Sequence, residues 1–426
     1  MRTSRESTPA AAGGRRRADG SPSHVPIAFL TDVEGQWERL RSFADGHPGL
    51  RLDGERLEVA AGWTFLFGGD AIDRGPHGRR VVRALLDAKR RQPDAVRWLI
   101  GNRDLNKLRL RRELDGHPPP RAQGSTRPAL LRWIFENTMG APDAFAFRQA
   151  ELAAEGLPSD DDTVVDSFLA DIAPDGDLFA ILDQGALAIR AGSALFVHGG
   201  VTPENLGHTP GSAPTADVDR WIAALEDFRA DGVDAYRRGV LRDGVPGGYA
   251  LVAYQAPLSG TRANAGSVIY GRTVDAANHL RRPAAAARAW LADNGVDRVI
   301  VGHTPIGDVP AIVADDRLVL VCADNSRATH PRGSWVAIDD RGVDVDAWAT
   351  VAGTLARVTA RVVPGDTGPV GLERADGTQV RGRLGDGRWL VHRMAPGYRS
   401  ETQAVEALGP LRLAEEDGHL SAAGRG

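Results

Sequence analysis

The stretch Gly68-Gly69-Asp70-Ala71-Ile72-Asp73-Arg74-Gly75 decides the fold of this 426-residue chain. It follows the apolar run Thr64–Phe67, and buried strands of α/β sheets commonly end in this way, with a polar side chain at the carboxyl edge. The glycines let the backbone approach a bound ion, and Arg74 can grip a phosphate group with two parallel hydrogen bonds. Asp70 is therefore the candidate bridging ligand of a metal centre.

Four more apolar runs end in polar residues that can bind metals. The runs are Ile27–Leu30, Val96–Ile100, Ala194–Val197 and Arg298–Val301, and they lead into Thr31-Asp32-Val33-Glu34-Gly35, Gly101-Asn102-Arg103-Asp104, His198-Gly199-Gly200 and Gly302-His303-Thr304-Pro305. Taken singly, an aspartate near glycine is usually a turn and a histidine after a strand is usually packed or solvated. Five such endings in one chain favour convergence on one site. The predicted metal ligands are Asp32, Asp70, Asn102, His198 and His303.

These ordered blocks resemble the signature of the calcineurin-like metallophosphoesterases, which include the Ser/Thr protein phosphatases and the dinucleoside-tetraphosphate hydrolases. The signature reads Asp-x-His, Gly-Asp-x-x-Asp-Arg-Gly, Gly-Asn-His-Glu/Asp, a strand-end His and Gly-His, and the chain follows it over about residues 27 to 325 with two substitutions. The chain also resembles a protozoan and bacterial subgroup whose blocks read Thr-Asp-Val-Glu-Gly and Gly-Asn-Arg-Asp-x-Asn-Lys, here Thr31–Gly35 and Gly101–Lys107.

The resemblance implies an α/β fold, the metallophosphoesterase-type four-layer α/β sandwich, with a dinuclear site of two divalent metal ions. It assigns Asp32 and Asp70 to the first metal, and Asp70, Asn102, His198 and His303 to the second. Such a site activates water for in-line attack on a phosphomonoester or a phosphoanhydride. Asp73 and Arg74 would belong to the catalytic machinery, with Arg74 also binding the phosphate.

The first substitution places Glu34 where the family has a histidine ligand. On an extended segment, its spacing points it to the same face as Asp32, so Glu34 is predicted to bind the first metal. An oxygen-rich first position favours Mn²⁺, Mg²⁺ or Fe over Zn²⁺, and Mn²⁺ is the metal we expect. The alternative is that Glu34 turns away to cap a turn and leaves the first metal weakly held.

The second substitution places Arg103 where the family has a histidine that protonates the leaving group. An arginine keeps its charge because its pKa lies above ~12, so Arg103 cannot be that general acid, but it can bind phosphate. It also returns the positive charge that Glu34 removes, so we interpret the two substitutions as an electrostatically compensated pair. Asp73 would then hold the guanidinium group.

Without a histidine acid, leaving groups that need no proton should be favoured. Phosphoanhydrides and aryl esters are therefore expected to react better than alkyl phosphates such as phosphoserine. Asp104 or a metal-bound water are the alternative sources of the proton.

Further basic residues are candidates for substrate binding. Arg272 ends the segment Ser267–Arg272, which is predicted to be a strand followed by a turn, and it would serve as another phosphate-binding arginine beside Arg74 and Arg103. Surface solvation is the alternative for Arg272 and for the weaker candidates Lys107, Arg109 and Arg262. The block Gly207-His208-Thr209-Pro210 repeats the last signature block, but no apolar strand precedes it, so His208 is predicted to lie in a loop.

The pattern along the chain predicts one large domain with additions. Residues 1–24 form a disordered tail, residues 25–350 the metallophosphoesterase domain, and residues 351–426 a small C-terminal β-rich appendage. Helical segments at Ala129–Asn137 and Ala144–Ala154 indicate a helical cap insertion over about residues 105–182. A second insertion, about residues 202–265, contains the predicted helix Ala216–Ala230. Trp37, Trp133 and Phe135 can stack on a substrate ring, although core packing is the commoner fate of such residues.

The amino-acid composition makes some classes of binding partner less favourable. The net charge of −4 gives no general attraction to nucleic acid or to anionic membranes, and the chain has no run of eighteen apolar residues. The single cysteine, Cys322, follows the apolar run Leu318–Val321 and is predicted to be a packed thiol in a buried strand. The absence of disulfide pairs favours a cytoplasmic location.

The leading function is hydrolysis of a phosphorylated small molecule, a nucleotide or a phosphoprotein. One alternative is a non-catalytic phosphoryl-binding pseudo-phosphatase, because the acid histidine is replaced. Another, a nucleic-acid phosphodiesterase, is disfavoured by the net charge and by Pro305, which stands where such an enzyme would have a second histidine.

Overall fold

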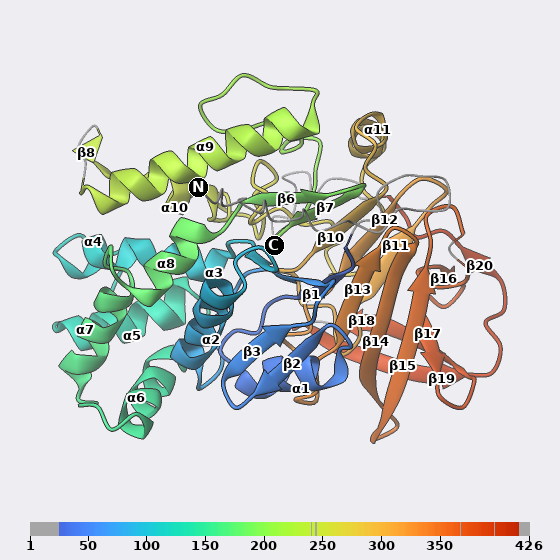
Figure 1. The fold of residues 1–426 in the computed structure, drawn as a ribbon, viewed down its shortest axis with the longest axis horizontal. Helices are drawn as coiled ribbons and strands as arrows, with labels where there is room; N and C mark the ends of the chain where they lie inside the picture. Colours follow the sequence, from blue (N-terminus) through green and yellow to red (C-terminus); the bar gives the residue numbers. More distant parts are fainter. Residues whose placement is uncertain (1–24, 240, 243–244, 367, 396, 417–426) are drawn as a thin grey trace, which may run out of the picture.

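The computed structural model describes residues 25–416 apart from 240, 243–244, 367 and 396, so the predicted tail, residues 1–24, lies outside the described residues. Two β-sheets pack face to face, and helices cover their outer sides (Figure 1). This is the four-layer α/β sandwich that the sequence predicts. Among the described residues, no helix is long and apolar enough to cross a membrane.

The first sheet joins the N-terminal strands to the C-terminal ones. Its order is β19 (Arg399–Val405), β18 (Trp389–Ala395), β17 (Gln379–Leu384), β15 (Thr354–Val362), β14 (Gly342–Val351), β13 (Trp335–Asp339), β1 (Ile27–Leu30), β4 (Thr64–Phe67) and β5 (Val96–Trp98). Off this path, β16 (Glu373–Arg374) pairs with β17, and β20 (Leu411–Arg412) pairs with β16. Strands β1, β4 and β5 are parallel, whereas β13 runs antiparallel to β1. The C-terminal β-rich region thus extends a core sheet, and it is the orange and red part of Figure 1.

The second sheet supplies the remaining strand ends. Its order is β11 (Ala311–Ala314), β12 (Val319–Cys322), β10 (Arg298–Val301), β7 (Ala194–Val197) and β6 (Ala188–Ala191), with β10 parallel to both β12 and β7. Two hairpins lie apart from these sheets, β2 (Leu50–Asp53) with β3 (Arg56–Val59) and β8 (Leu241–Arg242) with β9 (Val245–Pro246).

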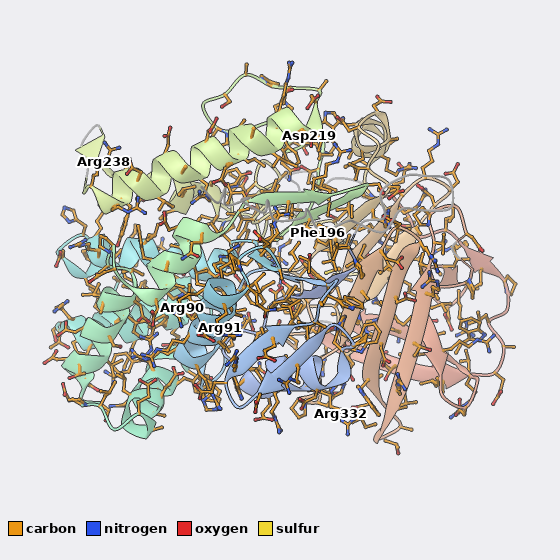
Figure 2. The ribbon with its side chains drawn as sticks, in the orientation of Figure 1. Arg90, Arg91, Phe196, Asp219, Arg238 and Arg332 are labelled. Atoms are coloured by element: carbon orange, nitrogen blue, oxygen red, sulfur yellow. The ribbon has the colours of Figure 1, made fainter. Side chains whose placement is uncertain are left out.

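A buried apolar layer holds the two sheets together. Phe29 of β1 contacts Phe196 of β7 across it, with ring centroids 5.7 Å apart, and Figure 2 labels Phe196. Leu66 of β4 and Ile300 of β10 belong to the same buried cluster. Alternate residues of each strand face this layer, so the strand ends are held at fixed positions next to one another.

The helices cover the sheets and form the predicted cap. They are α1 (Trp37–Gly46), α2 (Gly78–Arg91), α3 (Asn102–Leu105), the 3₁₀ helix η1 (Asn106–Arg109), α4 (Leu110–Leu114), α5 (Arg127–Thr138), α6 (Ala144–Ala154), α7 (Asp161–Asp171), α8 (Asp177–Gln184), α9 (Val218–Arg237), α10 (Tyr249–Tyr254) and α11 (Ala285–Asp293). Helix α2 joins the parallel strands β4 and β5, so the three elements form a βαβ unit. Helices α4 to α8 gather at one end of the molecule (Figure 1). The domain boundaries themselves stay a prediction.

Three predicted elements differ from the structure for identifiable reasons. Strand β5 ends at Trp98, because Leu99 leaves it to form a bridge with Ala186 next to the second sheet. Helix α9 continues past Ala230 to Arg237, and Gly232 inside it leaves room for Leu251 of α10, which a side chain there would strike. The predicted strand in Ser267–Arg272 is wrong: this segment is a turn, closed by a hydrogen bond from the Gly271 N–H to the Ser267 carbonyl.

His47 is buried at the end of α1 among aromatic rings. Its ring stacks on Phe43 at 5.3 Å between centroids and meets Trp63 and Trp335 edge-on at 4.9 Å each. Its Nδ1 accepts a hydrogen bond from the Gly49 N–H at 3.0 Å. Burial lowers the pKa of His47 from 6.5 to about 4, so the ring is neutral in the folded protein at neutral pH.

We predict that the buried His47 makes the free energy of unfolding decrease as the pH is lowered. The unfolded chain binds this proton near pH 6.5 but the folded chain only near pH 4, so the stability is fully present above pH 6.5 and is lost as the pH falls to about 4. His47→Asn keeps an acceptor for Gly49 and should flatten the slope of the unfolding free energy between these two values, measured by urea denaturation. The exposed His117 serves as control, because His117→Asn should keep the wild-type slope. Equal slopes in wild type and His47→Asn would contradict the assignment.

Candidate metal centre

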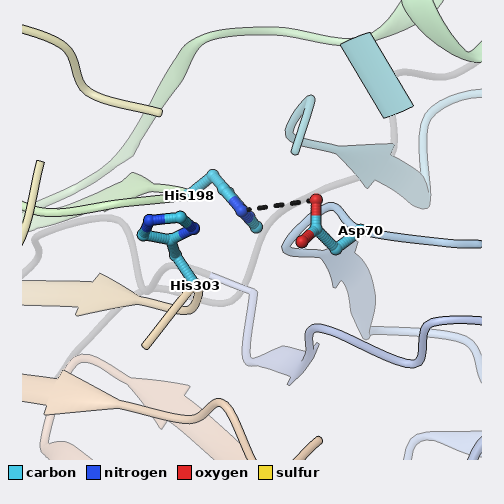
Figure 3. A group of neighbouring side chains, drawn as sticks. All are labelled: Asp70, His198 and His303. Atoms are coloured by element: carbon cyan, nitrogen blue, oxygen red, sulfur yellow. Dashed lines mark ion pairs between the residues drawn. The ribbon is translucent and has the colours of Figure 1, made fainter. Parts of the chain in front are cut away.

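All the predicted metal ligands meet where the parallel strands of the two sheets end. Ligand atoms of Asp70, His198 and His303 lie within 4.8 Å of one another, as Figure 3 shows for their side chains. A second group, Asp32, Glu34 and Asp70, meets the same distance limit. Asn102 joins the first group, with its Oδ1 2.8 Å from His303 Nδ1 and 3.3 Å from His198 Nε2. Asp70 is the residue that both groups share, which is the position required of a bridging ligand.

The loops that carry these ligands are tied to one another through backbone hydrogen bonds. The Asp32 N–H donates to the Gly69 carbonyl at 3.0 Å and the Glu34 N–H donates to the Asp70 carbonyl at 2.9 Å. The Arg74 N–H in turn donates to the Glu34 carbonyl at 2.8 Å. The first two blocks therefore form one unit.

Glu34 reaches the site by a route that the sequence argument did not describe. The segment Thr31–Gly35 is not extended, because Asp32 and Glu34 have φ angles of 53° and 51°. Asp70 and His303 share this left-handed conformation, with φ angles of 59° and 66°. Residues other than glycine rarely adopt it, at a cost of roughly 1–3 kcal/mol each, and they cluster at functional sites. The prediction that Asp32 and Glu34 share a face is thus met, but the extended-strand reason for it is wrong.

Two glycines of the blocks are required by close packing. A Cβ atom on Gly101 would lie 2.1 Å from Asp70 Oδ1, and one on Gly302 would lie 2.3 Å from Asp32 Oδ2. Any side chain at either position would displace a ligand carboxylate.

Asp104 holds the loops together through hydrogen bonds to backbone N–H groups. Its carboxylate accepts hydrogen bonds from the backbone N–H groups of Asp70, Ala71 and Gly101, at 2.9, 2.9 and 3.0 Å. The residue is fully buried. Burial raises the pKa of Asp104 above its usual value, and its role as an alternative source of the proton stays a prediction.

The histidine side of the site is suited to a metal cation. His198 Nδ1 lies 2.7 Å from the Gly68 carbonyl, a contact that places the proton on Nδ1 and leaves the lone pair on Nε2. Burial lowers the pKa of His198 to about 4 and, together with Arg272, lowers that of His303 well below its usual value. The side-chain amide oxygen of Asn102 points at the two imidazoles and faces only hydrogen-bond acceptors. Because no donor meets this oxygen, the orientation needs a cation to be stable. These neutral rings and this amide oxygen are the ligand forms that divalent metals require.

The carboxylate side has an excess of negative charge. Burial, Asp324 and Asp70 raise the pKa of Asp32 well above its usual value, and burial and Asp104 do the same for Asp70. Burial and Glu34 raise the pKa of Asp324 to about 6. A divalent cation would relieve this repulsion, and the unpartnered, buried Oε2 of Glu34 is a further ligand atom for it.

Asp324 was missed from the sequence, although a signal for it exists. It follows β12, which begins at the second residue of the apolar run Leu318–Val321. Strand β12 is parallel to β10, so its end reaches the same sheet edge as His303. The strand-end rule that found the other ligands would have found Asp324 as well.

The two substituted residues contact each other. Arg103 Nε donates to Glu34 Oε1 at 2.5 Å and lies 3.5 Å from Asp70 Oδ2. Although burial lowers the pKa of Arg103, Glu34, Asp70 and Asp73 together raise it above its usual value. Arg103 is therefore a permanent cation beside the carboxylates, which supports the compensated pair.

Asp73 has a different main partner from the one expected. Its Oδ2 accepts from Lys107 Nζ at 2.6 Å, whereas the Arg103 guanidinium lies 3.6 Å away. Lys107 is fully buried and also bonds to the Arg103 carbonyl at 3.0 Å and to Asn106 Oδ1 at 2.8 Å. Lys107 thus positions both Asp73 and the backbone of Arg103.

A cavity of about 240 Å³ opens onto the ligands, and all three predicted substrate-binding arginines, Arg74, Arg103 and Arg272, line it. Its other walls come from the cap, the second insertion and the C-terminal region, through Asn106, Arg109, Thr138, Met139, Gly140, Gln255, Ala256, Pro257 and Tyr398. Tyr270, which follows the second insertion, also lines the cavity. The aromatic candidates Trp37 and Phe135 are buried in the core and Trp133 packs against it. The rings at the cavity are Tyr270 and Tyr398, which the sequence argument missed.

Comparison with known proteins agrees with this geometry. A family model described as calcineurin-like phosphoesterase matches residues 25–307. No curated protein sequence matches the chain. Among solved structures, the chain is similar to a cold-active protein-tyrosine phosphatase from a psychrophilic Shewanella species, with 16% identity, a TM-score of 0.43 and coverage of 81% of this chain and 79% of that one. A protein serine/threonine phosphatase from Saccharomyces cerevisiae gives 12% identity, a TM-score of 0.35 and coverage of 74% and 73%. Similarities this low carry no argument about substrate.

We predict that the two ligand groups bind metal separately but share Asp70. In calorimetric titrations with Mn²⁺, His303→Ala should weaken one binding event and Asp32→Asn the other, each by at least about tenfold, because loss of an outer-shell partner alone costs that much. Asp70→Asn should weaken both events. The control is His208→Ala in the loop that repeats the sequence Gly-His-Thr-Pro, and this variant should bind as wild type. An unchanged titration in Asp70→Asn would contradict the shared ligand.

Proposed function

The chain belongs to the calcineurin-like phosphoesterase family, and we propose that it is a metal-dependent phosphoester hydrolase that acts on a phosphomonoester or a phosphoanhydride. The observation that carries the proposal is the position of Asp70 in two groups of buried ligand atoms at the base of an arginine-lined cavity.

The residues present fit two divalent metal ions. Asp32, Glu34 and Asp70 would hold the first, and Asp70, Asn102, His198 and His303 the second. When bound, such a pair supplies activation of water and charge stabilisation at the phosphoryl oxygens. The all-oxygen first position favours Mn²⁺, with Fe and Mg²⁺ next and Zn²⁺ least suited.

The arginines supply the phosphate-binding groups. Arg74 is anchored by the Gly140 carbonyl, 3.3 Å from its Nη2, and Arg272 Nη1 donates to Thr304 Oγ1 at 3.2 Å. Both guanidinium groups line the cavity and can bind phosphoryl oxygens with paired hydrogen bonds. Arg103 adds a third positive charge, held in place by Glu34 and by the Lys107–Asp73 pair.

Arg103 also limits the chemistry. Its raised pKa means that it never releases a proton to a leaving group, and Asp104 is tied to backbone amides. Arg103 therefore cannot supply the proton that the histidine of the family pattern gives to an alkyl leaving group. Within the proposed class, we infer a preference for nucleotides and other phosphorylated compounds with good leaving groups over phosphoserine proteins. The single buried Cys322 suits the cytoplasm.

One observation favours a second candidate function. The Arg103 guanidinium lies between Glu34 and Asp70 and already neutralises part of the first position. A protein whose arginine takes the place of the first metal would bind phosphoryl groups without hydrolysing them. This is the pseudo-phosphatase alternative.

We predict that the Mn²⁺-loaded protein hydrolyses a nucleoside polyphosphate and an aryl phosphate at least about 100-fold better, in kcat/KM, than a phosphoserine peptide, since a general acid contributes about 10²–10⁴-fold. Arg103→His supplies an imidazole and should narrow this gap, whereas Arg341→His, at an exposed position, should not.

Two outcomes would count against these statements. Equal or better turnover of phosphoserine by the wild type would contradict the leaving-group preference. Metal and phosphate binding without turnover of any phosphate ester would favour the pseudo-phosphatase.

A further inference from the structure

One wall of the cavity comes from the C-terminal region, whose purpose the sequence does not reveal. Tyr398 lies between β18 and β19 and lines the same cavity as Asp70 and Arg103. The strands β18 and β19 belong to the C-terminal part of the first sheet in Figure 1. A residue far from the metal ligands in sequence thus completes the cavity that holds them.

A second distant segment holds Tyr398 in place. Arg262 Nη2 donates to Tyr398 Oη at 2.6 Å, and the Arg262 guanidinium lies over the ring, 5.3 Å from its centroid. Arg262 belongs to the second insertion, which also contributes Gln255 and Pro257 to the cavity. The hydroxyl oxygen is the acceptor in this contact, and the ring edge and the ring face away from Arg262 are what Tyr398 offers to a flat ligand.

Tyr398 has a left-handed backbone conformation that is unfavourable for a bulky residue. Gly397 and Tyr398 have φ angles of 75° and 58°, and they lie in the turn that joins two antiparallel strands. Hairpin turns normally place glycine or asparagine at such angles, and a bulky residue there is strained. Strained residues concentrate at ligand sites, where the surrounding contacts hold them.

The cavity has a second ring next to the metal ligands. Tyr270 lines it and meets the ring of His303 edge-on, with 4.5 Å between the ring centroids. The Arg272 guanidinium lies over the Tyr270 ring, 5.6 Å from its centroid. The cavity therefore combines arginines and metal ligands, which suit a phosphoryl group, with two tyrosines and the apolar Met139 and Pro257, which suit a flat ring.

We propose that Tyr398, held by Arg262, is a specificity-determining residue that selects phosphorylated substrates with a flat aromatic ring in the leaving group, either an aryl ring or a nucleobase. This inference rests on the proposed function, because it assumes that the phosphoryl group sits at the metal ligands.

Non-hydrolysable phosphonates test the proposal without relying on turnover. The Mn²⁺-loaded full chain would be titrated with methylphosphonate, which has no ring, phenylphosphonate, and an adenosine 5′-phosphonate. We expect the wild type to bind at least one ring-bearing probe about tenfold more tightly than methylphosphonate. In Tyr398→Ala this preference should fall about fivefold, whereas the affinity for methylphosphonate should stay within about twofold of the wild-type value. The ring-bearing probe that loses affinity identifies the source of the ring.

Matched variants separate recognition from folding. Tyr398→Asn suits the left-handed backbone, so it should keep or raise Tm and still lose the ring preference. Tyr398→Phe keeps the ring and should retain most of the preference. Tyr249→Ala, at an exposed tyrosine outside the cavity, should bind as wild type.

Two results would overturn the proposal. The first is a wild type that binds methylphosphonate and shows no preference for either ring-bearing probe, or a preference that is unchanged in Tyr398→Ala and Tyr398→Asn. This result would remove the role of Tyr398 and leave the proposed function intact. A Mn²⁺-loaded wild type that binds none of the three phosphonates overturns both.

Discussion

The carboxylate of Asp70 is shared by two groups of buried ligand atoms, and the burial of that shared carboxylate constrains the structure around it. Burial raises the pKa of Asp70 and of the neighbouring Asp32, so the pair is stable as carboxylates only with positive charge beside it. The chain itself supplies part of that charge through Arg103. The imidazoles of His198 and His303 are kept neutral by burial, so they supply lone pairs and leave the remaining positive charge to cations.

The two packed sheets hold the residues of this site at fixed positions. The parallel strands β1, β4 and β5 of one sheet and β7, β10 and β12 of the other end at the same edge, and the apolar layer between the sheets fixes their relative positions. Backbone bonds then join the loops, and Asp104 ties the Asp70 loop to the Asn102 loop. Left-handed residues and buried charges persist because the surrounding structure determines their positions. Fold stability and the metal site are therefore linked through the same loops.

Local patterns in the sequence predict much of this, and long-range contacts account for what they miss. The strand Thr64–Phe67 and the helix Ala144–Ala154 are found at their predicted bounds, because an apolar run or a helical pattern with a clear stop determines them locally. The ligands are predicted for the same reason, since each follows a strand. The left-handed backbone at Glu34, the pairing of Asp73 with Lys107 and the entry of Tyr398 into the cavity depend on residues distant in sequence. The apolar Val268 and Ile269 suggested a strand, yet they are buried in a turn.

Glu34 and Arg103 distinguish this site from the family pattern, because an acidic and a basic residue in contact stand where the pattern has two histidines. Whether both metal positions fill beside that ion pair is the central claim. A crystal structure of the protein grown with Mn²⁺ tests it most directly through anomalous scattering. The account predicts two manganese peaks, both within bonding distance of the Asp70 carboxylate, with Glu34 at one and His303 at the other. A single peak at the histidine side, with the Arg103 guanidinium in the other position, would contradict it.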